Sequence, residues 1–309
     1  MVNRFIKLLS VFLAVVLLVN MLPLGIMAQD LQNSLSAKPT VTETVAEADT
    51  ADAEIVAEIL EKRTQYSKEF QLSNGMRLAT VYAEPVHYKT AEGWKEIDNT
   101  LVAKADGTYT NANAPWSVFF PQELTSENKV TVNVDGYSLS FIMDGQIRKS
   151  NALQRAAVPG LQSASGSKAT VKQPGALLKE MGLQDDKTTP QKLYSRITYA
   201  DVFENTDVVY DLESNAVKES IVLEQYDASL EGYRYTLYTG SLMPVMDDTG
   251  HIDLYAPGST EPVMSLPSPY MLDNAGQYCD QVQVTLTGGD GVYTMTYSLP
   301  QQWLASSEL

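Results

Sequence analysis

The chain has 309 residues and carries 22 Lys plus Arg against 38 Asp plus Glu, which gives a net charge of −16 at neutral pH. A surface this acidic repels phosphate backbones and anionic lipids, so nucleic acid is excluded as an expected partner. The single cysteine, Cys279, excludes an intramolecular disulfide framework, and 44% hydrophobic residues are enough for an ordinary apolar core.

Residues 1–28 are typical of a secretory signal peptide. Arg4 and Lys7 precede an apolar run over residues 8–19, and a proline, a glycine and a small residue follow that run. The alternative is an uncleaved anchor, because the run approaches the roughly 18 residues that a spanning helix needs. No other stretch is apolar enough to span a bilayer, so membrane contact is expected only through this segment if it is uncleaved.

The next segments are a spacer and the start of a β domain. Residues 29–53 are poor in large apolar side chains and rich in Ala, Thr, Ser and acids, which predicts a disordered acidic spacer. Ile55 and Ile59 then lie on one side at helical spacing, which predicts a short amphipathic helix over residues 53–67. An N-terminal β domain is predicted over residues 54–148.

Two hairpins carry clear turn signals within this domain. In FQLSNGMRL, Phe70 pairs with Leu78 if the loop has three residues and ends with Gly75 in the left-handed region. In VTVNVDGYSLSF, residues 130–141, apolar and polar side chains alternate on both sides of Asp135 and Gly136. Such an Asp-Gly pair predicts a type I′ turn and fixes the register of the two strands.

The stretch EPVHYKTAEGWKEIDNTL, residues 84–101, holds one of the two histidines of the chain. With Glu92 and Gly93 as the turn, His87 opposes Asp98 on a solvated face of a hairpin. The alternative is a catalytic pair of these two residues. Such a pair needs a nucleophile or a bound substrate, and no neighbouring residue offers a nucleophile, so the hairpin is favoured.

The second half of the chain begins after a predicted linker. Residues 149–191 lose the alternation and collect Ser, Gly, Ala, Gln and Pro, which predicts a flexible linker with one helical turn near residues 176–181. Strand patterns then resume. The last hairpin, VQVTLTGGDGVYTMTY, pairs Val284 with Met295 if the loop spans residues 288–291.

These elements predict a mainly β protein. The fold class is two antiparallel β-sandwich-like domains with a short N-terminal helix and a flexible mid-chain linker, because hairpins recur and no strand–helix–strand unit occurs. The second β domain is predicted over residues 192–304, and residues 305–309 form a tail.

Calcium is the one cofactor that the sequence raises. Asp247, Asp248 and Asp253 bring three carboxylates into one turn, and extracellular calcium sites are rich in oxygen ligands. An ordinary Asp-Asp-Thr-Gly turn is the favoured alternative. Otherwise no nucleotide-binding glycine pattern, paired C-x-x-C or H-E-x-x-H motif occurs, and no cofactor is expected.

Aromatic side chains are the candidates for ligand binding. Trp94, Trp116 and Tyr88 would suit a sugar-binding face, because flat rings combine an apolar surface with polar edges. The cores of β sandwiches use the same residue types, and this alternative is favoured. Cys279 would be a nucleophile only if a histidine reached it, and a lone thiol at the start of a strand is more often a small buried hydrophobe.

Three phrases of the sequence carry a family resemblance. They are EKRTQYSKEFQLSNGMRLATVYAEPVHYKTAEGWKEIDNTL, NANAPWSVFFP and VFENTDVVYDLESNAVKESIVL. Together they resemble the N-terminal region of secreted Gram-positive wall-associated proteins, in which such a region precedes a DNRLRE domain and RHS (YD) repeats. The resemblance implies export to the cell surface and, in some members, delivery of a C-terminal toxin. This chain has no D-N-R-L-R-E phrase and no YD repeat, and no catalytic residue is carried over.

The function expected from the sequence is that of a non-enzymatic, secreted module at the cell wall, serving structure, display or adhesion. The alternative is a glycan-binding module that uses exposed Trp and Tyr, with cell-wall glycan or other surface proteins as partners. The third hypothesis is a hydrolase with a site drawn from His87, Asp98 or Cys279.

Overall fold

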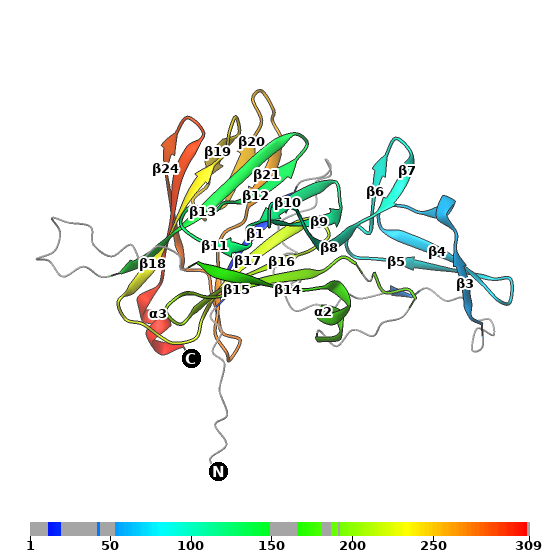
Figure 1. Cartoon of the computed structure of the whole chain (residues 1–309), viewed down its shortest axis with the longest axis horizontal. Coiled ribbons are helices and arrows are strands. Elements are labelled where there is room, and N and C mark those ends of the chain that lie inside the picture. The colour runs from blue at the N-terminus through cyan, green and yellow to red at the C-terminus, as the bar shows by residue number, and fades with distance from the viewer. Residues whose placement is uncertain are drawn as a thin grey trace, which may run out of the picture.

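The computed structural model describes residues 12–19, 42–43, 53–148, 166–180, 187–190 and 192–307. Most of the described chain forms antiparallel strands, which confirms the mainly β fold class (Figure 1). Most of the predicted spacer and the end of the predicted tail lie outside the described residues. No helix in the described ranges is long and apolar enough to cross a membrane.

The largest sheet of the described residues has nine strands in the order β11-β14-β15-β16-β17-β1-β21-β20-β19. In that order they are β11 (Glu123–Leu124), β14 (Ser167–Lys172), β15 (Ser195–Phe203), β16 (Thr206–Leu212), β17 (Ala216–Leu223), β1 (Phe12–Val19), β21 (Pro262–Leu266), β20 (Ile252–Tyr255) and β19 (Met243–Met246). The run predicted as the core of an export signal therefore overlaps β1, while its cleavage stays a prediction.

The second sheet has eight strands in the order β24-β25-β18-β13-β12-β10-β9-β8. They are β24 (Gln283–Gly289), β25 (Val292–Ser298), β18 (Leu230–Tyr238), β13 (Tyr137–Arg148), β12 (Val130–Val134), β10 (Trp116–Phe120), β9 (Tyr109–Asn113) and β8 (Asp98–Ala103). Because β13 pairs with β18, strands from both predicted β segments take part in this sheet.

Smaller elements complete the described structure. A four-stranded sheet contains β2 (Thr42–Glu43), β5 (Arg77–Val81), β4 (Ser67–Leu72) and β3 (Ile55–Glu58). Two-stranded pairs are β6 (His87–Thr90) with β7 (Gly93–Glu96), and β22 (Met271–Leu272) with β23 (Tyr278–Cys279). The helices are the 3-10 turn η1 (Leu60–Lys62), α2 (Pro174–Glu180) and α3 (Gln301–Ser306). Both β14 and α2 fall in the predicted linker.

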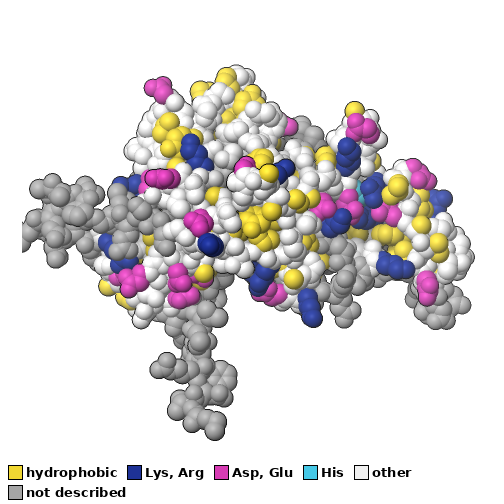
Figure 2. Space-filling model, in the orientation of Figure 1, with side chains coloured by type: hydrophobic (Ala, Val, Ile, Leu, Met, Phe, Trp, Pro, Cys, Tyr) yellow, Lys and Arg dark blue, Asp and Glu magenta, His cyan; other side chains and the backbone are white. Residues whose placement is uncertain are grey.

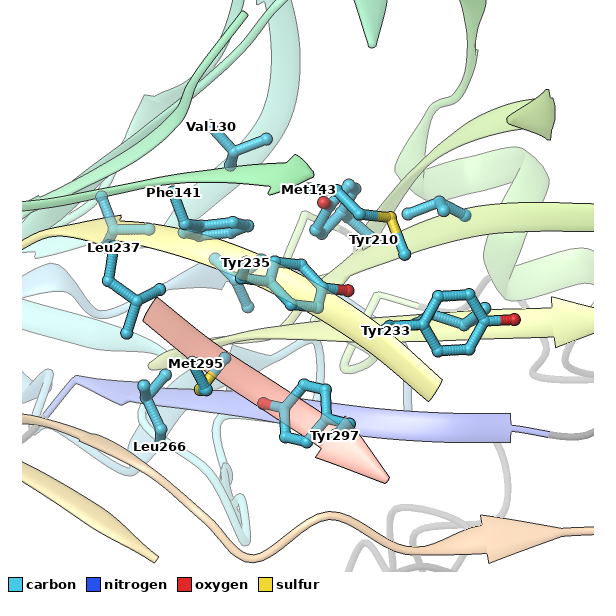
Figure 3. Close-up of a cluster of buried hydrophobic side chains, with 14 of the residues drawn as sticks. Val130, Phe141, Met143, Tyr210, Tyr233, Tyr235, Leu237, Leu266, Met295 and Tyr297 are labelled. Atoms are coloured by element: carbon cyan, nitrogen blue, oxygen red, sulfur yellow. The ribbon is translucent and has the colours of Figure 1, made fainter. Parts of the chain in front are cut away.

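The core lies between the two large sheets, where aromatic side chains of one sheet meet those of the other. Tyr210 of β16 contacts Phe120 of β10 with ring centroids 5.1 Å apart, and it contacts Phe141 of β13 at 6.3 Å. Figure 3 shows Tyr210, Tyr235 and Tyr297 within this apolar cluster. These ring pairs are tilted, with interplanar angles of 42° and 46°, and such contacts add to the stabilisation from burial itself.

Two predicted hairpins are confirmed in register. Val132 pairs with Leu139 across the turn at Asp135 and Gly136, whose φ angles of 50° and 82° fit a type I′ turn. Phe70 pairs with Leu78, and Gly75 has the left-handed φ of 85°. In both hairpins the residues at the turn tolerate a positive φ, so the turn residues alone are enough to predict how the two strands pair.

Two other registers are wrong by two residues. His87 pairs with Glu96 and not with Asp98, because the turn of this hairpin comes before Gly93. Val284 pairs with Tyr297 and not with Met295, because the turn tightens to Asp290 and the glycine after it. A shift of two residues leaves each side chain on the same face of the hairpin, so the predicted alternation of faces along each strand is unchanged.

The predicted helix over residues 53–67 is also wrong. This segment forms β3, which pairs with β4, and then the single turn η1. Ile55 and Val56 are β-branched and favour an extended backbone when an edge is available for pairing. After the turn, Arg63 donates to both carboxylate oxygens of Glu58, at 2.7 and 3.0 Å, and this pair holds the returning chain against β3.

Candidate functional site

A groove with a volume of about 1450 Å³ lies at the C-terminal end of the described chain. Its walls are the turn between β19 and β20, the segment from β23 into β24, and the start of α3. Three stretches of sequence that lie far apart therefore meet there: residues 246–250, 278–285 and 298–302. We call this site the C-terminal groove.

Polar side chains and one exposed ring line the C-terminal groove. Tyr278 is 51% exposed and stacks on the buried Tyr270, with ring centroids 5.4 Å apart and an interplanar angle of 26°. Asp280, Gln281 and Gln283 follow it along the chain and are exposed. A ring held in place from behind, with carboxylates and amides beside it, can stack on an apolar face of a ligand while accepting hydrogen bonds from its hydroxyls.

The carboxylates predicted as calcium ligands are only partly in this groove. Asp247 and Asp248 line it, whereas Asp253 does not. Asp247 accepts hydrogen bonds from the backbone and hydroxyl of Thr249, at 2.8 and 2.7 Å, and these bonds lower the pKa of its carboxyl. Asp253 accepts from His251 Nε2 at 3.0 Å. Among the described residues no group of three or more His, Cys, Asp or Glu side chains could hold a metal ion.

The aromatic residues predicted for sugar binding are not brought together. Trp116 is buried at 3% exposure, and its Nε1 donates to the carbonyl of Ser214 at 3.1 Å. Tyr88 donates to Asn113 Oδ1 at 2.6 Å. In the β6–β7 ladder Trp94 pairs with Lys89, one position along from Tyr88, so the two rings lie on opposite faces of the hairpin.

His87 is the clearest departure from the expected solvated hairpin face. Its side chain is 0% exposed, and its Nδ1 donates to the carbonyl of Thr64 at 2.7 Å. Its Nε2 lies 3.9 Å from Glu58 Oε1, and burial lowers the pKa of the imidazole. The chain that leads from η1 to β4 lies beside this residue, since the carbonyl of Gln65 accepts from the backbone N–H groups of Val86 and His87 at 2.8 and 3.2 Å.

The other proposed partners of a hydrolase site lie elsewhere. Asp98 pairs with Lys192 at 3.0 Å and accepts from the backbone of Thr100 at 3.0 Å. Cys279 is buried in β23 opposite Met271, and burial raises the pKa of its thiol. The structure therefore does not assemble His87, Asp98 and Cys279 into one site.

Glu219 is a buried acid that the sequence analysis missed. It lies on β17 at 4% exposure, where Tyr210 and Tyr235 donate to its carboxyl oxygens at 2.5 and 2.9 Å. Burial raises the pKa of this carboxyl to about 7. The sequence VKESIVL could have indicated this site, because Glu219 stands there at a position of the strand where an apolar side chain is expected. A small cavity of about 20 Å³ adjoins it.

Comparison with known proteins gives distant relatives. No family model and no solved structure matches the chain. The tRNA nuclease WapA of Bacillus subtilis strain 168 is 22% identical over 326 residues, which cover 99% of this chain and 13% of the relative. The tRNA(Glu)-specific nuclease WapA of B. subtilis subsp. natto is 23% identical over 325 residues, with the same coverage. A wall-associated protein of Geobacillus stearothermophilus is 22% identical over 231 residues, 73% of this chain and 79% of the relative.

These relatives correct the expectation that the chain is not an enzyme. Relatives that match nearly the whole of this chain are named tRNA nucleases, so the expectation of a non-enzymatic protein is not supported. This chain spans 13% of the length of those nucleases. The chain is similar over nearly its full length to WapA proteins of Bacillus and over most of it to a wall-associated protein, in agreement with the cell-wall location expected from the sequence.

Proposed function

We propose that this chain belongs to a cell-wall-associated protein and that its C-terminal groove binds cell-wall glycan. The observation that carries the proposal is the exposed ring of Tyr278, stacked on Tyr270 and flanked by amide and carboxylate side chains. The wall-associated protein among the relatives supports the location. Export and display at the surface, as in the N-terminal region of DNRLRE and RHS proteins, are part of this proposal.

The chemistry of the groove suits an uncharged sugar polymer. Sugar rings present C–H faces that stack on an aromatic ring, and their hydroxyls donate to carboxylates and to amide oxygens. Asp247, Asp248 and Asp280 make the groove acidic. The groove therefore selects neutral glycan over polymers that carry phosphate, because like charges repel at short range.

The test is retention of the purified chain on insoluble peptidoglycan. Tyr278→Ala is expected to weaken retention about tenfold, since one ring contact contributes about 1 to 1.5 kcal/mol. Trp94→Ala is the matched control, because Trp94 is a partly exposed aromatic residue outside the groove. The control is expected to bind like the parent chain. Equal retention of all three chains, or loss only with Trp94→Ala, contradicts the proposal.

The names of the relatives favour a second candidate function, RNA cleavage. His87 is a candidate for proton transfer, because the carbonyl of Thr64 fixes its Nδ1 and its Nε2 faces Glu58 at 3.9 Å. Because the ring is fully buried, a substrate would reach it only after the β6–β7 hairpin opens. Incubation of tRNA with the chain tests this candidate. His87→Ala is expected to abolish cleavage and His251→Ala to leave it unchanged, and cleavage that survives His87→Ala rejects this site.

A further inference from the structure

The strand β1 fills a position that joins two parts of the nine-stranded sheet. It pairs with β17 from Phe12 opposite Val222 to Leu18 opposite Ala216, and with β21 at its end, where Val19 lies opposite Met264. Both pairings are antiparallel. β17 continues to β16 on its other side, and β21 continues to β20. Among the strands that the structure describes, only β1 connects β17 with β21 in this sheet.

The segment that forms β1 is also the one predicted to leave the chain. Residues 12–19 are the apolar run of the predicted signal peptide over residues 1–28. Removal of that peptide exposes the inner edges of β17 and β21 at once, with backbone N–H and C=O groups that β1 pairs in this structure. We call the space between these two edges the strand slot.

The strand slot has an apolar inner side. Val217 and Ile221 of β17 and Leu266 of β21 are buried in the core cluster. Val217, Glu219 and Leu266 also line the small cavity of about 20 Å³ in this core. In Figure 3 the blue strand β1 crosses the view between the labelled Leu266 and Tyr297. The acid in this lining, Glu219, is already satisfied by Tyr210 and Tyr235. An incoming strand therefore meets apolar surface and no free charge on this side.

We propose that, in the exported chain, the strand slot binds an extended apolar strand of a second polypeptide, which completes the sheet as β1 does here. Pairing on two edges at once gives such a strand its main-chain hydrogen bonds, and alternate side chains enter the core. The register with β17 sets a length of at least seven residues. The buried inner face requires uncharged side chains at every second position. The proposal rests on export with removal of residues 1–28 and is independent of glycan binding.

Hydrogen exchange on the secreted chain tests the proposal. The chain is collected from the medium of a Gram-positive host and its N-terminus is read by mass spectrometry. The probe is a peptide with the sequence FLAVVLLV between lysine tails. It is expected to slow amide exchange in β17 and β21 by at least a hundredfold. β19, an edge strand of the same sheet with Val245 57% exposed, is the internal control and is expected not to change.

Two peptide variants test the geometry of the strand slot. The position that pairs with Val217 projects to the core face, and the position that pairs with Lys218 projects to the other face, because directly opposed residues share a face. Leu17→Asp in the peptide is expected to abolish protection, and Val16→Asp to weaken it less than threefold. The proposal is overturned if the secreted chain keeps residues 1–28, or if β17 and β21 are protected without peptide, as a monomer or a dimer. Equal effects of the two variants also overturn it.

Discussion

Glu219 shows at the scale of one residue how the fold changes an ordinary side chain. Its carboxyl is buried between the two large sheets, and burial raises its pKa to about 7. Glu213 is shifted in the same direction to about 7, by burial and then by the charge of Glu84. Each acid binds a proton more tightly in the folded chain than in the unfolded chain, whose Glu pKa is near 4.3.

The sign of this linkage gives the first prediction. A raised folded-state pKa makes the contribution of Glu219 to stability complete below about pH 4, and that contribution is lost as the pH rises through about 7. A shift of this size corresponds to a loss on the order of 3 kcal/mol. The free energy of unfolding of the parent chain should therefore fall between pH 4 and pH 8, and Glu219→Gln is expected to remove the part of this fall that Glu219 causes. Urea unfolding between pH 4 and pH 8 measures it, with Glu213→Gln as the matched variant. A decline that Glu219→Gln leaves intact contradicts the prediction.

The two histidines give a second prediction because their surroundings differ. His87 is fully buried and hydrogen bonded to Thr64, whereas His251 is partly exposed beside Asp253. His87→Ala is expected to lower the free energy of unfolding by about 2 to 4 kcal/mol, because it leaves a cavity and an unsatisfied carbonyl. His251→Ala is expected to cost less than about 1 kcal/mol. Denaturant unfolding of both variants at pH 7.5 compares them, and equal losses would reject the buried role of His87.

Strand elements differ in how closely they approach their neighbours, which leads to a third prediction. A Cβ at Gly232 of β18 would lie 1.9 Å from the carbonyl oxygen of Tyr297, while a Cβ at Gly136 would meet nothing within 4 Å. Gly232→Ala is therefore expected to cost about 3 kcal/mol or more, because β18 and β25 must separate. Gly136→Ala is expected to lower the free energy of unfolding by about 1 to 2 kcal/mol, because only the positive φ of this position strains an alanine. Thermal unfolding measures the stability of the two variants. A smaller loss of stability for Gly232→Ala than for Gly136→Ala contradicts the prediction.

The elements also show what could be predicted from the sequence. The β12–β13 hairpin was predicted in full, because Asp135 and Gly136 fix its turn locally. The β6–β7 and β24–β25 registers were missed, because each loop contains a glycine that fits more than one turn length. The helix expected over residues 53–67 was wrong, since pairing of β3 with β4 is a contact between separate segments that helical spacing does not reveal.

The candidate site was harder to predict than the strands. The sequence pattern at Asp247 and Asp248 indicates calcium ligands, and the structure places both residues in the wall of the C-terminal groove. Tyr278 was not singled out, because nothing in its own segment indicates that Tyr270 supports it or that α3 closes the far wall. Figure 2 shows Lys, Arg, Asp and Glu side chains interspersed over one face, so the net charge alone does not locate a site either.

At the scale of the whole molecule, the pairing of β13 with β18 decides how the two halves behave. This ladder runs from Ser140 opposite Tyr238 to Arg148 opposite Leu230, with two register shifts along it. The aromatic core crosses the same boundary, since Phe141 and Tyr235 contact each other and Tyr235 also donates to Glu219 of the opposite sheet. Each half therefore buries part of its apolar surface against the other.

This shared interior predicts one cooperative unfolding transition for the two β segments. The midpoints from tyrosine fluorescence and from circular dichroism are expected to coincide, because the buried tyrosines and the shared sheet are lost together. Phe141→Ala and Tyr235→Ala, one in each segment, are each expected to shift that single midpoint by an amount equivalent to about 3 to 5 kcal/mol. Two separate transitions, or a variant that moves only one of them, would mean that each segment folds around a core of its own. In that case the contacts across β13 and β18 would contribute little to stability.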